Sequence, residues 1–178
     1  MFIRTDRLLL RPSWPDDLDE LVELLNEEPV ARSIGTGGVP ANADALLEMI
    51  NRPRDVHLPH LFIHLRTHDG LKLIGGIGLG RAGEDVELGY WLARAYWGNG
   101  YASEAVGALL EHAWMLGHPR VIARHFADSV GTDRVLAKAG FQETGEVTMR
   151  YSAARGHEAR TITYVAARPD IPSFSQVA

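Results

Sequence analysis

The sequence predicts an α+β (mixed α/β) fold. In it, a mixed β-sheet is flanked by helices in a single domain. Three observations support this prediction. Three strand-like segments with short turns follow one another in the middle of the chain, a strongly amphipathic helix comes directly after them, and the final third alternates strand and helix patterns. Strands joined by short turns pair antiparallel, and helices that pack on such a sheet bury its faces.

The first third of the chain is expected to form one strand and two helices. Leu8 to Leu10, between two arginines, predict a short strand, and Ser13 with Pro15 predicts the start of a helix. The buried face of this helix carries apolar residues at helical spacing: Leu18, Leu21, Val22 and Leu25. A stretch with glycine and proline, 35–40, separates it from a weaker helix at 43–51.

The middle of the chain is expected to form an antiparallel meander followed by the clearest helix. The expected strands are His60–Thr67, Lys72–Leu79 and Val86–Leu92, with turns at 68–70 and 80–84. An apolar stripe then predicts the helix, and it consists of Ala102, Ala105, Val106, Leu109, Leu110 and Ala113. Gly117 is expected to end this helix.

The last third completes the sheet. The expected elements are, in order, a strand at 120–125, a short helix at 131–139, a strand from Phe141 onward and a strand at 158–167. Two prolines, Pro169 and Pro172, then favour an irregular end. The predicted organisation is therefore one domain at 1–168 with a C-terminal tail at 169–178.

Composition excludes several classes of function. The 178 residues are 46% hydrophobic and 23% charged, with a formal net charge of −5 and no cysteine. The lack of cysteine excludes disulfides, thiolate metal sites and cysteine nucleophiles. The acidic balance disfavours nucleic-acid and membrane-surface partners. No apolar run approaches the roughly 18 residues of a membrane span, and the start lacks the apolar core of a signal peptide, so a cytoplasmic location is expected.

Two glycine clusters are candidates for binding a phosphate. Gly78 to Gly83 matches the G-x-G-x-x-G pattern, but an acidic, strand-like segment follows it where a dinucleotide site needs a helix. We therefore expect a plain turn there. The cluster at 97–102 lies between a strand and the clearest helix, where glycines and the helix start can present backbone N–H groups to an anion. A glycine-rich helix entry without a ligand is the alternative for this second cluster.

Three segments together resemble the GCN5-related N-acetyltransferase (GNAT) superfamily. They are Glu87–Leu92, Tyr96–Ala105 and Arg134–Phe141, and they follow one another in the order and at the spacing of that superfamily. The opening segment Thr5–Pro12 is similar to its RimJ/RimL-like branch, the ribosomal-protein-alanine N-acetyltransferase type. The resemblance covers nearly the whole chain. It implies a GNAT-type sheet that is splayed in the middle to admit acetyl-coenzyme A (acetyl-CoA).

The resemblance also implies which residues bind acetyl-CoA. The Q/R-x-x-G-x-G/A loop of the superfamily aligns with 97–102, whose backbone would hold the diphosphate, and the strand end at 90–92 would pair with the pantetheine arm. The implied set is Tyr90, Trp91, Leu92, Trp97, Gly98, Asn99, Gly100, Tyr101, Ala102, Ser129 and Thr132. Two positions depart from the pattern, because Trp97 replaces the usual Gln or Arg and Ser129 replaces the usual Asn.

Two residues are expected to act in catalysis. A primary amine has a pKa of about 10.4, so the site must lower that pKa or supply a base through ordered water. Glu87, on the strand that leads into the splay, is the candidate base, and the alternative is a solvated carboxylate paired with a neighbour. Ser129 is the candidate to assist departure of the CoA thiolate, and the alternative is water. Leu136 stands where many members of the superfamily place a general-acid tyrosine.

The predicted function is direct, acetyl-CoA-dependent N-acetylation of a primary amine, on a protein N-terminus or on a small molecule. One alternative is a non-catalytic acyl-CoA-binding regulatory protein of the same fold, and another is a nucleotide-binding protein that uses the same helix start. The acidic balance slightly favours a cationic acceptor. The protein is expected to be a monomer or homodimer.

No metal is expected to take part. The histidines at positions 60, 64 and 68 would share one face of a strand, but their spacing is too long for a tight ligand set. We expect His60 and His64 to lie at the acceptor cleft instead, because their strand is predicted to lie beside the splay.

Overall fold

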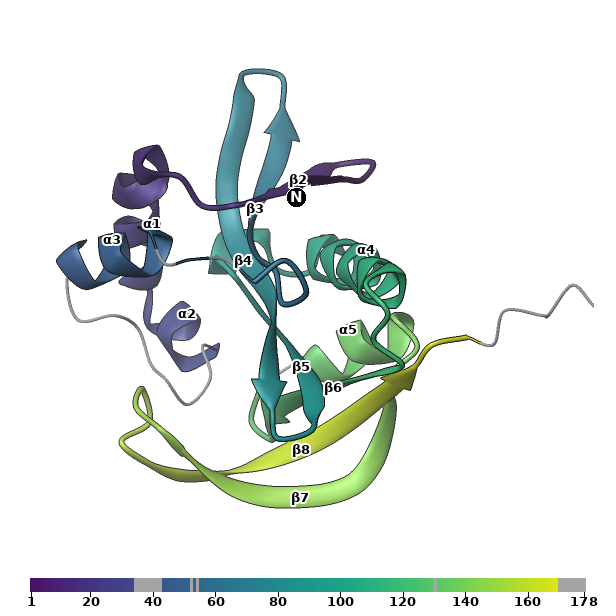
Figure 1. Cartoon of the computed structure of the whole chain (residues 1–178). Coiled ribbons are helices and arrows are strands. Elements are labelled where there is room, and N and C mark those ends of the chain that lie inside the picture. Colours follow the sequence, from purple (N-terminus) through teal and green to yellow (C-terminus); the bar gives the residue numbers. More distant parts are fainter. Residues whose placement is uncertain (34–42, 52, 54, 130, 170–178) are drawn as a thin grey trace, which may run out of the picture.

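The protein forms one eight-stranded sheet with helices on both of its faces (Figure 1). The computed structural model describes residues 1–33, 43–51, 53, 55–129 and 131–169. The strands are β1 (Ile3–Arg4), β2 (Leu8–Arg11), β3 (His60–Thr67), β4 (Gly70–Ala82), β5 (Asp85–Leu92), β6 (Arg120–Phe126), β7 (Gln142–Ser152) and β8 (His157–Ala167). The helices are α1 (Leu18–Leu25), α2 (Glu28–Ser33), α3 (Ala43–Asn51), α4 (Tyr101–Met115) and α5 (Thr132–Lys138), with short 3₁₀ turns at Pro15–Asp17 and Arg94–Tyr96.

The strand order in the sheet is β1-β2-β3-β4-β5-β6-β8-β7. The pairs from β1 to β5 are antiparallel, as are β6–β8 and β8–β7, whereas β5 and β6 run parallel. The parallel pair follows from the chain path, because α4 carries the chain back across the sheet between the two strands. The predicted mixed α+β sheet and its central antiparallel meander are therefore confirmed.

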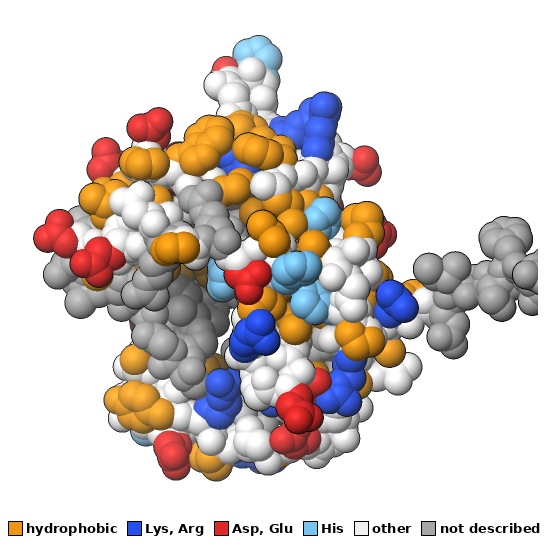
Figure 2. Space-filling model, viewed as in Figure 1, with side chains coloured by type: hydrophobic (Ala, Val, Ile, Leu, Met, Phe, Trp, Pro, Cys, Tyr) orange, Lys and Arg blue, Asp and Glu red, His pale blue; other side chains and the backbone are white. Residues whose placement is uncertain are grey.

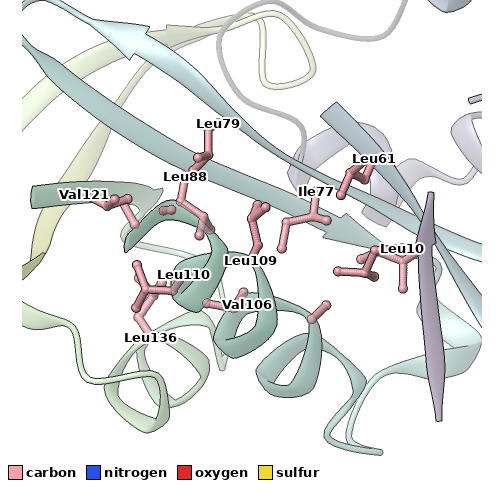
Figure 3. Close-up of a cluster of buried hydrophobic side chains, with 14 of the residues drawn as sticks. Leu10, Leu61, Ile77, Leu79, Leu88, Val106, Leu109, Leu110, Val121 and Leu136 are labelled. Atoms are coloured by element: carbon pink, nitrogen blue, oxygen red, sulfur yellow. The ribbon is translucent and has the colours of Figure 1, made fainter. Parts of the chain in front are cut away.

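Two apolar clusters lie on opposite faces of the sheet. The larger one packs α4 and α5 against the central strands, with Leu79, Leu88 and Leu109 almost fully buried (Figure 3). The smaller one packs α1, α2 and α3 against β3 and β4, around Leu21 and Leu73. Its described members come from no strand beyond β5, so on this face β6, β8 and β7 extend past the helices (Figure 1).

The first helix begins later than its sequence suggested. Pro15 to Asp17 form a 3₁₀ turn and α1 starts at Leu18, because the Asp17 carboxylate accepts a hydrogen bond from the backbone N–H of Trp14 at 2.7 Å. Two short elements, β1 and α2, were not predicted. The predicted Gly/Pro stretch at 35–40 and the tail beyond residue 169 lie outside the described residues. No described helix is both long and apolar enough to cross a membrane.

The rejected G-x-G-x-x-G match is a hairpin. Gly78 and Gly80 lie within β4, Gly83 occupies the turn at φ +68°, and β5 follows. Glycine in the same strand also permits a close approach, because a Cβ on Gly76 would lie 2.6 Å from the indole nitrogen of Trp91. The predicted plain turn is therefore confirmed, and the glycines of β4 make room for a neighbouring tryptophan.

Candidate active site

The sheet opens between β5 and β6. Their pairing is confined to Glu87 with Ile122 and Leu88 with Ala123, after which the two described strands separate. Backbone groups of successive strand residues point to opposite sides. Ala93, just after β5, donates its N–H to Ile74 of β4 at 2.9 Å. By this alternation, Tyr90 and Leu92 present their backbone groups to the side from which β6 has diverged.

A glycine-rich loop leads from the end of β5 into α4. Gly98 and Gly100 have φ of +76° and +80°, a left-handed conformation that other residues adopt only with strain. Glu104 is the first residue of α4 to bond back, donating its N–H to Gly100 at 3.1 Å. Within the described part of the chain, the backbone N–H groups of residues 98–103 therefore have no acceptor. This cluster of free donors at a helix start favours an anionic ligand.

The turn between β1 and β2 holds this loop in place through Glu104. Its carboxylate accepts hydrogen bonds from the Thr5 hydroxyl (2.6 Å), the Arg7 backbone N–H (2.8 Å) and the Arg7 guanidinium (2.7 Å). Burial alone would raise the pKa of Glu104, but these bonds together hold it below its ordinary value. The Arg7 guanidinium also donates to the Asn99 carbonyl at 2.9 Å. These contacts explain why the opening segment belongs structurally with the loop at 97–102.

The far side of the opening is formed by the start of α5. Tyr90 of β5 makes a side-chain hydrogen bond with Thr132, the first residue of α5. Burial raises the pKa of Tyr90 to about 12, so its phenol stays protonated at neutral pH. Ser129 lies in the loop between β6 and α5 and donates its backbone N–H to Phe126 at 2.9 Å. The structure thus brings Tyr90 and Thr132 together, with Ser129 in the loop that leads to Thr132.

Glu87 lies on the other face of β5, among arginines. One carboxylate oxygen contacts Arg124 of β6 at 2.9 Å, and the other contacts Arg150 of β7 at 3.4 Å. All three side chains are partly exposed, at 23% for Glu87, 21% for Arg124 and 35% for Arg150. The pairing register explains the contact with Arg124, because Arg124 directly follows the last β6 residue that pairs with β5. Glu87 is therefore a paired carboxylate at the base of the opening.

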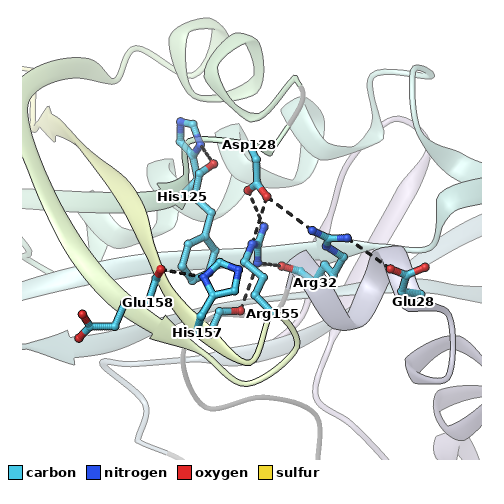
Figure 4. A network of polar contacts seen from close by, with 9 residues as sticks. Glu28, Arg32, His125, Asp128, Arg155, His157 and Glu158 are labelled. Carbon is cyan, nitrogen blue, oxygen red and sulfur yellow. Dashed lines mark hydrogen bonds and ion pairs between the residues drawn. The ribbon is translucent and has the colours of Figure 1, made fainter.

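A second polar network ties three separate segments together on the same face (Figure 4). Arg155, in the turn between β7 and β8, contacts both oxygens of Asp128 at 3.1 and 2.6 Å and the backbone oxygen of Arg32 at 2.8 Å. Its side chain is only 4% exposed and lies over the Phe126 ring. The hydrogen bonds from Arg155 hold the pKa of Asp128 below its ordinary value. Because Asp128 precedes Ser129, this network fixes the loop that carries Ser129.

Three of the expected residues use their side chains in contacts within the protein. The Trp91 side chain packs against the smaller apolar cluster, on the face opposite α4, while the Trp97 indole donates to the Leu92 carbonyl at 2.8 Å. His64 is buried, 2% exposed, and its Nε2 lies 3.4 Å from Asp17. His64 is therefore part of the packing of β3 and not of a cleft. Among the described residues no three His, Asp or Glu side chains form a group that could hold a metal ion.

Sequence reasoning did not find the arginines of the site. Arg124, Arg150 and Arg155 meet their carboxylate partners only through the pairing of β6, β7 and β8, and nothing in their local sequence indicates that pairing. Arg7 lies within the segment Thr5–Pro12, which resembles the family, and this position could have indicated its role.

Of two cavities in the described part of the structure, one lies beside these elements and the other lies away from them. One, of about 170 Å³, lies on the arginine-bearing face and is lined by Arg124, Thr163 and neighbours on β5 to β8. The Thr163 hydroxyl is buried and has no hydrogen-bond partner within the described residues. The larger, of about 560 Å³, lies on α3, between Asp44 and Pro53. It is lined by no residue of the β5–β6 opening and is not part of the site.

Comparison with known proteins identifies the family. The uncharacterized N-acetyltransferase YoaA of Bacillus subtilis is 28% identical over 173 residues, which are 94% of this chain and 97% of that protein. The fold matches RimL, a ribosomal L7/L12 α-N-protein acetyltransferase solved with coenzyme A, at a TM-score of 0.73 with 16% identity over 94% of this chain and 98% of that one.

The fold of this chain also matches that of a Vibrio cholerae spermidine N-acetyltransferase, solved with CoA and spermine. The TM-score is 0.74, with 18% identity over 92% of this chain and 96% of that one. Residues 7–142 match the acetyltransferase (GNAT) domain family, and they include the loop, the parallel pair and the start of α5 described above. With that match across most of its length, the chain belongs to the GNAT family of N-acetyltransferases.

Proposed function

We propose that the protein transfers an acetyl group from acetyl-CoA directly to a primary amine, on a small molecule or at a protein N-terminus, in the cytoplasm. The observation that carries this proposal is the opening of the parallel pair beside a helix start with free N–H groups. One element can hold an anionic, phosphate-bearing ligand, and the other offers unpaired strand backbone to an extended, amide-containing arm.

The residues present fit acetyl-CoA. The backbone N–H groups of residues 98–103 would bind the diphosphate, and the backbone of Tyr90 would bond to the pantetheine arm. Acetyl-CoA supplies the acetyl group as an activated thioester. Since the chain has no cysteine, no enzyme thioester can form, and we propose that the amine attacks the thioester of acetyl-CoA directly.

A protonated acceptor amine loses two protons in the reaction, one before it attacks the thioester and one as the amide forms. The first must be removed against a pKa of about 10.4 for a free lysine-like amine. Glu87 is held between Arg124 and Arg150, so the geometry favours a role in orienting the amine while the first proton leaves through water. The Ser129 hydroxyl is proposed to donate a hydrogen bond to the departing thiolate, which takes up the second proton released by the amine and whose thiol has a mild pKa of about 8.5.

The activity is tested by measuring thiol release from acetyl-CoA with a panel of amines. The panel includes amino acids, peptide N-termini and spermidine, because RimL is a protein α-N-acetyltransferase and the V. cholerae enzyme is a spermidine acetyltransferase. Turnover on at least one amine is expected, together with thermal stabilisation by acetyl-CoA but not by ATP or NAD. Stabilisation without turnover on any amine would instead support an acyl-CoA-binding regulator.

The role of Glu87 is tested in the same assay. Glu87→Gln is expected to lower kcat/KM while the acidic limb of the pH profile keeps its shape, since orientation is lost but the proton path is not. Loss of that limb would identify Glu87 as the base.

A further inference from the structure

The arginine-bearing face beside the opening, which we take as the acceptor side, has an excess of positive charge. Arg124 and Arg150 share the single carboxylate of Glu87, so the three side chains together keep one positive charge. Each arginine contacts Glu87 through one terminal nitrogen. Among the described residues, the remaining guanidinium nitrogens of both have no hydrogen-bond partner. A guanidinium has five N–H donors, so most of the donors in this cluster are unused.

Other charges nearby do not cancel this excess. Asp85 of β5 is paired with Arg120 of β6, and Glu146, which lines the 170 Å³ cavity with Arg124, is exposed and forms no ion pair within the described part of the chain. Arg155 is engaged with Asp128. Among the described residues, Arg124 and Arg150 thus keep free donors beside the opening.

The net charge of the whole chain does not describe this face. Residues 1–51 contain ten of the 23 Asp and Glu residues and four of the 18 Lys and Arg residues. The first third therefore accounts for the entire negative balance, and the rest of the chain is slightly positive. Figure 2 shows acidic side chains gathered at the left edge, over α1 and α3, whereas acidic and basic side chains mix over the strands of the lower half.

We propose that the acceptor is an amine that also carries a carboxylate, and that Arg124 and Arg150 bind this carboxylate. The inference rests on the proposed acetyltransferase function and deepens it. Two guanidinium groups with free donors match the geometry of a carboxylate, which accepts paired N–H bonds. The same cluster repels a polyamine, whose second ammonium group would face two arginines. An amino acid or an acidic peptide N-terminus fits the site, and spermidine does not.

Matched acceptors test the inference. We compare kcat/KM for an amino acid and its carboxamide, for a peptide with Glu at its second position and the same peptide with Gln, and for spermidine. The acid member of at least one pair is expected to be favoured by about tenfold or more, as charge-assisted hydrogen bonds imply. Turnover with equal or better use of the amides or of spermidine would overturn the inference while leaving the acetyltransferase proposal intact. No turnover on any amine would overturn both.

Arginine variants locate the effect. Arg150→Gln is expected to reduce the acid-to-amide ratio of kcat/KM toward one. Arg160→Gln is the matched control, because Arg160 is exposed on the neighbouring strand and, by strand alternation, belongs to the face that carries Tyr164. An unchanged ratio in Arg150→Gln would contradict the proposal. Arg150→Lys keeps the charge without the paired donors, and it is expected to give an intermediate ratio if the Gln variant fails to fold.

Discussion

The two sides of the β5–β6 opening are built in different ways. On the α4 side, the free groups are backbone N–H donors from residues 98–103 and strand backbone at Tyr90, supported by the larger apolar cluster. On the β7–β8 side, the groups are side chains in ion pairs, and their partners lie far apart in sequence. Arg155 reaches Asp128 and Arg32, and Glu87 joins Arg124 to Arg150.

This difference separates two tasks. In the proposed function, backbone donors would bind the invariant part of acetyl-CoA whatever side chains surround them, provided that the two positive-φ glycines keep the loop in shape. Side chains on the other face can change without altering that backbone. Under this proposal, one coenzyme site could serve different acceptors, and the side chains of the arginine-bearing face would determine which acceptor is used.

Among the variants of the two sides, Gly100→Trp is expected to have the largest effect. Gly100 has φ +80°, and a Cβ there would lie 3.5 Å from the Arg7 guanidinium. A large side chain at this position distorts the loop and covers its N–H groups. Acetyl-CoA binding is expected to be abolished, as measured by calorimetry or by loss of thermal stabilisation, in addition to a backbone strain of about 1–2 kcal/mol.

Gly83→Trp is the matched control. Gly83 also has positive φ, at +68°, with open space around it, but it lies in the β4–β5 turn. This variant should lose a similar amount of stability and keep its affinity for acetyl-CoA. Unchanged acetyl-CoA affinity in Gly100→Trp would mean that the loop at 97–102 is not the binding site.

A smaller effect is expected for Arg155→Ala on the acceptor side. The change leaves the Arg32 carbonyl without its donor and leaves Asp128 with only its longer ion pair to Arg32, at 3.8 Å, at a cost of about 2–3 kcal/mol in the free energy of unfolding. The cost is below that of a fully buried pair because Asp128 is 52% exposed. Turnover and the KM for the amine should worsen more than the dissociation constant for acetyl-CoA, as steady-state kinetics and calorimetry would show.

Two further variants make this result specific. Arg134→Ala removes an exposed arginine of α5 and should change neither quantity. Arg155→Lys keeps the charge but cannot contact all the partners of Arg155 at once, so it should rescue only part of the turnover. An equal loss of acetyl-CoA affinity and amine KM in Arg155→Ala would show that the two sides are not separable.

The difference between the two sides also explains which features could be predicted from the sequence. The meander, α4 and the turn at Gly83 follow from local patterns of apolar residues and glycines, and the structure confirms them. The loop at 97–102 was identifiable because strand, glycines and helix are adjacent in the chain. The contacts of Glu87 with Arg124 and Arg150 depend on β6 and β7 lying near β5, and α2 depends on packing against the sheet, so neither has a local signature.

On the α4 side, the loop at 97–102 depends on one set of charged contacts, those of Glu104. Glu104→Gln weakens the bonds from Thr5 and Arg7 and should cost about 1–2 kcal/mol in the free energy of unfolding at pH 7. Because the pKa of Glu104 is lowered by folding, the carboxylate stabilises the protein above the unfolded-state pKa of about 4.3. That advantage is lost as pH falls through the lower, folded-state pKa.

Urea unfolding of the Glu104→Gln variant at neutral and acidic pH measures this dependence. The difference between wild type and Glu104→Gln should shrink toward acidic pH, whereas Glu111→Gln, at an exposed position of the same helix, should differ little from wild type at either pH. A modest weakening of acetyl-CoA binding in Glu104→Gln alone would show that the β1–β2 segment positions the loop. A stability difference that stays constant with pH would instead assign the role of Glu104 to packing and not to charge.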